Sequence, residues 1–565
     1  MLGVVGMKKA SSHCKSPSEQ LILPLVDGGV TSAPCATTAG LKRSANHGKV
    51  VFKPYQIDQI MLPMDVGLLV PPNHVSRVVS DAIDRMNLAP VLKRFKPGGT
   101  SSYHPRMMLK VLVYAFSQRR FSSRDIEKSL AENIYFMWLA GGNRPDHNTI
   151  NRFRSVTLKG IIGEVFAAVL ELLVEEKYVK LEDFFLDGTK VEANANKFSY
   201  AWGKSIKRYS KQIREKVHQL LAEVEQLNCN EDEQFGDADL LGIAEKPLDS
   251  AKLEETINNL NERLAGKKQD RRTKTILRHL KDKFLPKIKD YEGQEAILED
   301  RNSFSKTDPG ATFMRLKDDH MNTGHLKPAY NVQIATEDQF ILNYFVNQNA
   351  NDSVALIPTL NTYNQLTGRL PKHVTADAGY GSEENYEYLA ALGINAYVKH
   401  QEFYRESKPA FRDNPFRPAN MPYDKDNNEF TCPAGRKLKY KESKTETTIN
   451  GHQIERCVYV SEGCEGCTLR DKCTKGQGDK NISMSFRCWE LRAKASELLR
   501  SEEGEKQRSR RGHDVESVFG HIKHNLGFRR FKLRTLDKVN VEWGLLCIAH
   551  NLQKKAYILQ DRARQ

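Results

Sequence analysis

The chain has 565 residues, 39% of them hydrophobic and 28% charged, and its 86 Lys and Arg against 71 Asp and Glu give a formal net charge of +15. This composition is typical of a globular, water-soluble protein with several domains, since single domains rarely exceed about 250–300 residues. The positive charge favours an anionic partner, of which nucleic acid is the commonest, and no apolar run approaches the ~20 residues of a membrane-spanning helix.

The first 160 residues are predicted to form an extension followed by helices. Residues 1–48 are rich in Ser, Gly, Thr and Ala without sustained periodicity, which predicts a disordered extension. Residues 49–160 show helical periodicity and are assigned to an all-α N-terminal domain. Arg119, Arg120 and Arg124 lie between two of its helices, a pattern that fits either a helix-turn-helix-like DNA reader or an ordinary helical bundle.

A short strand and a charged helical segment follow. Within residues 161–202, the apolar run 184–186 predicts a buried strand that ends at Asp187-Gly188, a common turn sequence. Residues 203–300 are highly charged, with sparse apolar positions at helical spacing. This pattern predicts a helical hairpin or coiled-coil insertion whose charges face solvent.

A hairpin and a strand–helix–strand unit are predicted within residues 301–400. Two β-rich runs flank residues 336–338, which predicts an antiparallel hairpin. The segment "HVTADAGYGSEENYEYLAALGINAYVKH" then indicates a strand ending at Asp377, a Gly-rich turn, a helix and a strand around residues 396–398. Such a βαβ unit implies parallel pairing, so the expected core is an α/β fold with a mixed sheet flanked by helices.

Residues 401–485 are predicted to be an irregular insertion that carries a cluster of cysteines. The pair Cys464 and Cys467, with two further thiolates, fits a tetrahedral structural zinc site. Apolar residues precede the basic pair at the N-terminus, the reverse of a secretory signal, so we expect a cytoplasmic protein in which a disulfide is disfavoured. Cys473 is the third candidate ligand, and the fourth remains open between Cys432 and Cys457.

Residues 486–565 are predicted to be helical and to close the core. Helical spacing places Val515, Val518, Phe519, Ile522 and Leu526 on one apolar face. Glu516 lies off this face, and either a surface ion pair or a functional role explains it. The surrounding basic residues, which bind phosphates without reading sequence, are His521, Lys523, His524, Arg529, Arg530, Lys532 and Arg534.

Three acids could together form a metal site. Asp187 and Asp377 each follow an apolar run, and side chains at the ends of such strands point toward the ligand crevice of α/β sheets. Glu516 would join them from a helix. Chemistry at a phosphodiester commonly uses two divalent metals ~3.5–4 Å apart, and Mg²⁺ prefers carboxylate oxygens. Each acid also has an ordinary structural explanation, as a turn residue or a surface Glu.

The order of six motifs resembles the DDE-type transposases of bacterial insertion sequences, most closely the group numbered 1182. The likeness runs from about Lys53 to the C-terminus. The motifs are "FKPYQIDQIMLP", "HPRMMLKVLVYA", "FFLDGTKVEANANKFSYAW", "GHLKPAYNVQIA", "TADAGYGSEENY" and "VESVFGHIKHNLGFRRFKLR…EWGLLCIAHNL".

The resemblance implies an RNase H-like catalytic core in which Asp187, Asp377 and Glu516 are the catalytic acids. They would hold two Mg²⁺ or Mn²⁺ ions. The implied partner is double-stranded DNA, both the terminal inverted repeats and the target, bound by a homodimer in the bacterial cytoplasm at the nucleoid, with residues 49–160 as the DNA-binding domain. The implied activity is metal-dependent DNA strand cleavage followed by strand transfer.

The resemblance also suggests residues that contact DNA. Related enzymes often carry a Tyr-Arg-Glu-Lys signature, in which Lys523 matches the Lys. Gly512 occupies the usual Arg position, so Arg511 would serve with a one-residue shift, and Ser509 leaves the Tyr role unassigned. Further candidates for phosphate contact are Lys190, Arg529 and Arg530. Two alternatives stay open: an inactive DNA-binding derivative of a transposase, and an RNase H-like nuclease without strand transfer.

Overall fold

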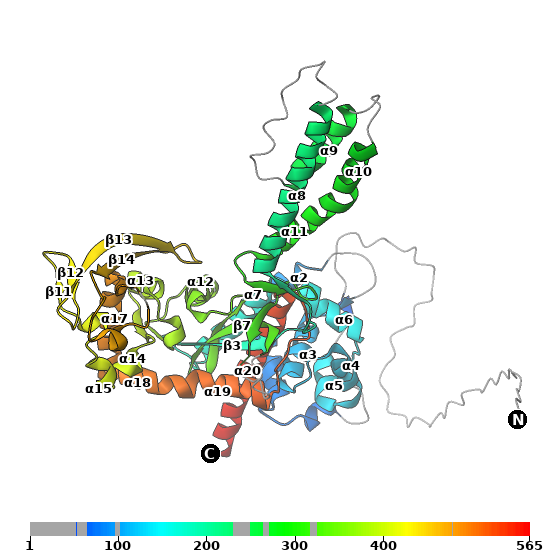
Figure 1. Cartoon of the computed structure of the whole chain (residues 1–565). Coiled ribbons are helices and arrows are strands. Elements are labelled where there is room, and N and C mark those ends of the chain that lie inside the picture. Colours follow the sequence, from blue (N-terminus) through cyan, green and yellow to red (C-terminus); the bar gives the residue numbers. More distant parts are fainter. Residues whose placement is uncertain are drawn as a thin grey trace, which may run out of the picture. The chain divides into compact units, whose positions relative to one another are not determined.

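A six-stranded mixed sheet lies at the centre of the fold (Figure 1). The computed structural model describes residues 52–53, 65–95, 102–229, 249–263, 271–316, 325–476 and 478–565, so the extension predicted for residues 1–48 lies outside the described residues. The strands follow the order β10-β9-β3-β7-β6, with β8 also paired to β7. Their bounds are β3 Asp183–Glu192, β6 Thr312–Arg315, β7 Leu326–Glu337, β8 Phe340–Asn347, β9 His373–Ala376 and β10 Asn395–Val398.

Two predicted strand arrangements are confirmed. Strands β7 and β8 form the antiparallel hairpin around residues 336–338. Strands β9 and β10 are parallel and are connected by helix α13 (Glu383–Ala391), as expected of a βαβ unit. Strand β3 is antiparallel to β7 and parallel to β9, so it joins the hairpin to the βαβ unit. The predicted α/β class with a mixed sheet is therefore confirmed.

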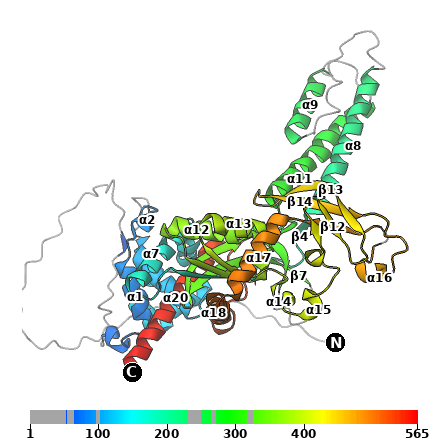
Figure 2. The same ribbon diagram turned by 90° about the vertical axis from the view of Figure 1, so that its left-hand side faces the viewer.

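Helices cover both faces of this sheet. Helices α12 (Leu356–Thr367) and α13 lie on one face, and the helical segment with α18 (Glu502–Arg511) and α19 (Ser517–Gly520) lies on the other (Figures 1 and 2). All residues of β7 from Ala329 onward are accordingly buried.

The C-terminal helix joins the N-terminal helices to the sheet. Helix α20 (Leu536–Arg564) contacts β8 and also α1, α3 and α7. These elements contribute to one continuous hydrophobic core. Among the described residues, no helix combines the length and apolar character needed to cross a lipid bilayer. The N-terminal helices are α1 Val75–Arg85, α2 Ala89–Leu92, α3 Pro105–Ser117, α4 Ser123–Glu132, α5 Ile134–Ala140, α6 His147–Arg152 and α7 Ile162–Glu175.

The charged segment after β3 forms helices with their own small core. Strands β4 (Tyr200–Trp202) and β5 (Ser303–Ser305) pair where this segment leaves and rejoins the rest of the chain. Its apolar core includes Val217, Val224 and Leu280. The helices are α8 Gly203–Cys229, α9 Ser250–Arg263, α10 Arg271–His279 and α11 Leu285–Leu298, with a π turn at Leu280–Phe284 between the last two.

The prediction of an irregular insertion over residues 401–485 is wrong. This segment contains a five-stranded antiparallel sheet in the order β11-β12-β13-β14-β15, with an aromatic core around Phe430 and Tyr459. Its longest strand has mostly exposed, polar side chains, so the sequence carries no alternation to reveal it. The strands are β11 Tyr423–Asp424, β12 Glu429–Thr431, β13 Lys437–Thr447, β14 Gln453–Ser461 and β15 Asn481–Met484.

A buried carboxylate fixes the entry of the chain into β3. The Glu337 side chain accepts four backbone hydrogen bonds, from the N–H groups of Lys180 and Leu181 at 2.6 and 2.8 Å and from those of Glu182 and Asp183 at 2.9 Å each. Glu337 is 3% exposed. Since β3 carries Asp187, this carboxylate sets the position of the candidate site.

Replacing Glu337 by Gln is expected to destabilise the protein by about 3 kcal/mol, because the amide turns a donor toward buried N–H groups that lose their acceptor. The midpoint of thermal or urea unfolding measures the change. Glu462→Gln is the matched control, since Glu462 is an exposed partner of Lys439 and should change stability by less than about 0.5 kcal/mol. Equal effects of the two substitutions would contradict this role for Glu337.

Candidate active site

Asp187 lies in the middle of a strand, so the prediction that the strand ends at Asp187-Gly188 is wrong. Strand β3 continues to Glu192 and pairs with β7 along this whole stretch. The Gly188 N–H donates to Asp187 Oδ1 at 2.9 Å. A Cβ atom at Gly188 would lie 2.9 Å from Asp352 Oδ1, so glycine is needed here for close approach and not for a turn.

Asp377 follows β9, as predicted, and lies level with Asp187. The parallel register pairs Phe185 of β3 with Thr375 of β9, and each aspartate is two residues further along its own segment. Asp377 is the N-cap of the short 3₁₀ turn Ala378–Tyr380, and its Oδ1 accepts from the Gly379 N–H at 2.8 Å. The register therefore brings the two aspartates to the same place on adjacent segments.

Glu516 ends a π-helical turn, Gly512–Glu516 (η7), that interrupts the helical segment between α18 and α19. A π turn adds one residue to an α-helix and is often found at functional sites. Arg511, five residues before Glu516, consequently reaches it, with Nη1 3.3 Å from Oε1. The π turn gives a physical reason for the one-residue shift expected of Arg511. The five residues predicted as the apolar face of this segment are all buried.

The three predicted acids converge on one cation. Arg511 Nη2 lies 3.1 Å from Asp187 Oδ1 and 4.0 Å from Asp377 Oδ2, while its Nη1 contacts Glu516. The Arg511 side chain is 9% exposed, against 18% for Asp187, 42% for Asp377 and 61% for Glu516. One guanidinium offsets only one of three negative charges, so the cluster keeps a surplus of negative charge at a surface that solvent can reach.

Asp352 is a fourth acid at this site that the sequence analysis missed. It follows β8, and its Oδ1 accepts from Asn331 Nδ2 at 2.7 Å and from Gln333 Nε2 at 3.2 Å. Burial, and then the carboxylates of Asp352, Asp187 and Asp377, raise the pKa of Tyr380 well above its usual value. Only the fold brings Asp352 to the other acids, since "NQNANDS" resembles an ordinary loop and helix cap.

The donor set suits a hard divalent cation. Mg²⁺ takes carboxylate oxygens, and here several carboxylates already surround a positive charge, that of Arg511. As the side chains stand, no group of three or more His, Cys, Asp and Glu in the described part of the chain is arranged to hold a metal ion. The residues fit the chemistry of Mg²⁺ or Mn²⁺, but the acids would have to exchange Arg511 for the metal.

The predicted phosphate-binding residues are placed in different ways. Arg529 is exposed, whereas Arg530 donates to the backbone carbonyls of Ala193 and Ala195 at 3.2 Å each and so holds the chain that follows β3. Lys190 is half-buried on β3. Lys523 lies in a second π turn, His521–Asn525. Because this turn departs from α-helical geometry, a spacing of two α-helical turns does not ensure that Lys523 lies on the same helical face as Glu516. His524 is exposed within this turn, and Lys532 and Arg534 are exposed after it.

Two aromatic residues lie in the hydrophobic core, and most of the candidate zinc ligands lie around one pocket. Phe528 and Phe531 are buried beside Trp543 and belong to the hydrophobic core. Four of the five candidate zinc ligands line one pocket, whereas Cys457 lies on β14 within the antiparallel sheet and is not among the lining residues. The four are Cys432, Cys464, Cys467 and Cys473.

Two family models match parts of the chain. Residues 431–556 match a family described as "Transposase DDE domain", and residues 65–156 match a family described as "Transposase domain (DUF772)". No curated protein matches the chain. Both matched models describe transposase domains, which indicates a transposase.

The matched domains support a DDE-type transposase of the kind that insertion sequences encode. Glu516 lies inside the matched DDE domain, whereas Asp187 and Asp377 lie outside it.

Proposed function

We propose that this transposase cuts DNA at the ends of its insertion sequence and joins the freed ends to a target, with Asp187, Asp377 and Glu516 as the catalytic acids of an RNase H-like core. The observation that carries the proposal is the convergence of these acids on Arg511, one from β3, one from the turn after β9 and one from the helical segment between α18 and α19. A purely structural role does not explain why three partly exposed carboxylates lie together, because like charges at close range repel and this costs stability.

The acids would hold Mg²⁺ or Mn²⁺, two ions in the complete site, which lower the pKa of a bound water and stabilise charge on a phosphodiester. The Arg511 guanidinium must then leave at least part of the carboxylate cluster. The polar pair Asn331 and Gln333 would keep Asp352 oriented toward the site. The acids are thereby positioned before DNA arrives, which reduces the cost of organising them during the reaction.

A basic surface beside the acids would bind the DNA backbone. Exposed Arg529 and Lys532 follow the helix of Glu516. At the α3–α4 junction, exposed Arg119 is near enough to His521 to lower the pKa of that imidazole, although burial is the larger cause. The N-terminal arginines and the C-terminal basic residues would thus contact the same DNA, and affinity should fall steeply with salt. A homodimer would bring the two ends together in the bacterial nucleoid.

An inactive DNA-binding derivative is the second candidate, and a specific observation favours it. Arg511 already bonds the three acids, and a guanidinium held permanently there would exclude a metal ion. This candidate predicts binding to DNA ends without cleavage.

Labelled DNA carrying both ends of the element, incubated with the full chain and Mg²⁺ or Mn²⁺, separates the candidates. Metal-dependent nicking at the ends, followed by joining to an added plasmid, supports the proposal. Binding without cleavage supports the inactive derivative. Cleavage without joining, even with pre-cut ends supplied, would instead indicate a nuclease.

Asp352→Asn is expected to lower the rate of end cleavage about 10- to 100-fold and to raise the Mg²⁺ concentration needed, because Asp352 adds negative charge beside Asp187 and Asp377. Cleavage rates across a Mg²⁺ titration measure both effects. Asp426→Asn, an exposed aspartate in the β11–β12 turn, is the control and should behave as wild type. An unchanged Mg²⁺ requirement in Asp352→Asn would assign Asp352 to structure alone.

A further inference from the structure

We propose that Cys432, Cys464, Cys467 and Cys473 bind one structural Zn²⁺ ion, which ties the loop after β14 to the turn between β12 and β13. This site is separate from the acidic cluster and goes beyond the proposed DNA chemistry. Structural zinc is held in tetrahedral geometry by four Cys or His ligands, and in all-cysteine sites a Cys-x-x-Cys pair commonly supplies two of the thiolates.

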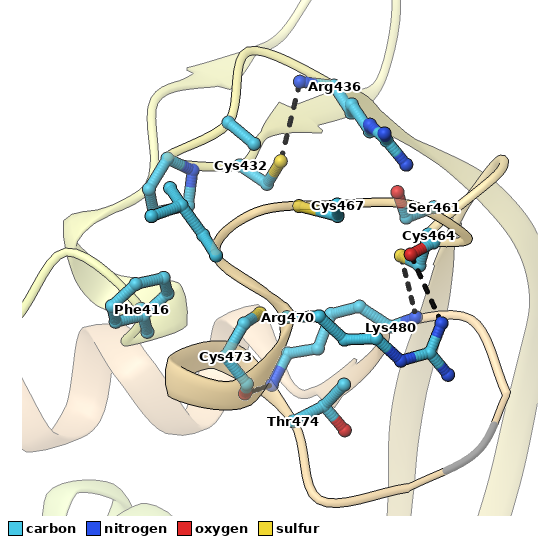
Figure 3. Close-up of a pocket in the computed structure, with 13 residues that line it drawn as sticks. Phe416, Cys432, Arg436, Ser461, Cys464, Cys467, Arg470, Cys473, Thr474 and Lys480 are labelled. Atoms are coloured by element: carbon cyan, nitrogen blue, oxygen red, sulfur yellow. Dashed lines mark hydrogen bonds between the residues drawn. The ribbon is translucent and has the colours of Figure 1, made fainter.

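The fold gathers these cysteines from three places in the sequence. Cys432 directly follows β12, Cys464 and Cys467 lie in the loop after β14, and Cys473 ends the short helix α16 (Arg470–Cys473). All four line one pocket of about 20 Å³ (Figure 3). A volume of this size admits about one water-sized particle, so the pocket suits a single ion.

The backbone is arranged to favour thiolates at two of the four sulfurs. The Arg436 N–H donates to Cys432 Sγ and the Lys480 N–H donates to Cys464 Sγ, each at 3.3 Å (Figure 3). Hydrogen bonds to the charged form of an acid stabilise that form. The turn that aims the first of these N–H groups needs Gly435, whose φ of +75° is disfavoured for other residues.

The charges around the pocket also suit a zinc–thiolate centre. Four thiolates and one Zn²⁺ carry a net charge of −2, and Arg436, Arg470 and Lys480 line the same pocket. Arg436 Nη1 is buried and finds no hydrogen-bond partner among the described residues. A sheet made mainly of polar strands gives no reason to place three cations beside four thiols, whereas a dianionic centre would offset them.

The cysteines among the described residues form no disulfide. In the same part of the chain, no three side chains of His, Cys, Asp or Glu are already placed to hold a metal ion. Zinc would therefore displace the thiol protons and draw the four sulfurs inward, which couples metal binding to the order of the loop.

Zinc content of the purified full chain tests the assignment. After dialysis, release of zinc by a mercurial reagent, detected with a zinc-binding dye, should give about one ion per chain. Cys464→Ser and Cys467→Ser should lose most of it. Cys457→Ser is the matched control, because it removes a thiol from the same sheet that does not line the pocket, and it should keep its zinc.

Co²⁺ titration of the metal-free wild-type chain gives a readout that does not depend on the folding of a variant. Four thiolate ligands should produce intense sulfur-to-cobalt charge-transfer absorption, and Zn²⁺ should abolish it stoichiometrically. No charge transfer, a disulfide between Cys464 and Cys467, or zinc loss in Cys457→Ser without loss in Cys464→Ser would each overturn the proposal. These measurements use no DNA, so their outcome is independent of whether the chain cuts DNA.

Discussion

Glu516→Gln is expected to reduce the rate of DNA-end cleavage at least about a thousandfold while leaving DNA affinity unchanged. A metal ligand stabilises the charge of the transition state by several kcal/mol, and each 1.36 kcal/mol corresponds to a factor of ten in rate. Gln keeps the shape of the side chain but removes the charge that a divalent cation requires. Glu516 is 61% exposed, so the substitution should not unfold the protein. End cleavage and gel-shift affinity are measured on the same labelled DNA.

Glu505→Gln is a closely matched control for this experiment. Glu505 lies on α18, the same helical segment, is similarly exposed, and pairs with Arg508 at 3.5 Å, as Glu516 pairs with Arg511. The two variants make the same chemical change, and only one lies at the acidic cluster. If both variants cleaved like wild type, Glu516 would be only a surface residue in an ion pair. If both lost cleavage, a general effect of charge on this helix would be responsible.

The sequence predicts which acids lie together better than it predicts the local structure that positions them. The hairpin follows from two β-rich runs, and the βαβ unit follows from a strand, a Gly-rich turn, a helix and a further strand, which correctly places Asp377 after a strand. Asp187-Gly188 resembles a turn, but pairing with β7 overrides that local preference. Nothing in the sequence around Asp352 distinguishes it from an ordinary loop residue. Its place beside the other acids depends on hydrogen bonds from Asn331 and Gln333 of β7, which only the fold brings near.

Two further features depend on packing that no periodicity reveals. A π turn cannot be distinguished from an α-helical turn in the sequence, so the contact from Arg511 to Glu516 over five residues appears only in the structure. The antiparallel sheet around the cysteines has polar strands, and its order comes from a few aromatic side chains gathered at one end. In both cases local propensity is weak, and tertiary contacts decide the conformation.

Arg511→Ala is expected to destabilise the metal-free protein by about 1–3 kcal/mol and to increase its apparent affinity for Mg²⁺ or Mn²⁺ about tenfold. Loss of a buried partner leaves mutually repelling carboxylates, although the exposure of Asp377 and Glu516 reduces the cost below that of a fully buried pair. In the wild type, a metal ion must compete with the Arg511 guanidinium. The metal binds only the less populated arrangement in which the guanidinium has left the acids, so its apparent affinity is lower. Thermal unfolding across a Mn²⁺ titration measures both quantities.

Arg510→Ala is the control, because Arg510 precedes Arg511 and pairs with Asp183 and Asp338, away from the cluster. It should lose stability without any gain in the stabilisation by Mn²⁺. A similar Mn²⁺ response in wild type and Arg511→Ala would mean that the guanidinium does not compete with the metal.

The outcome for cleavage then distinguishes two roles of Arg511. If Arg511 only keeps the acids together until metal binds, Arg511→Ala should cleave DNA nearly as fast as wild type at saturating Mn²⁺. If the released guanidinium instead contacts DNA phosphate, cleavage should stay low at any metal concentration, and Arg511→Lys should recover only part of it because ammonium cannot bind in two-pronged fashion. Metal-dependent cleavage by the wild type, in either case, would require that Arg511 yields its place, which excludes the permanently blocked site of an inactive derivative.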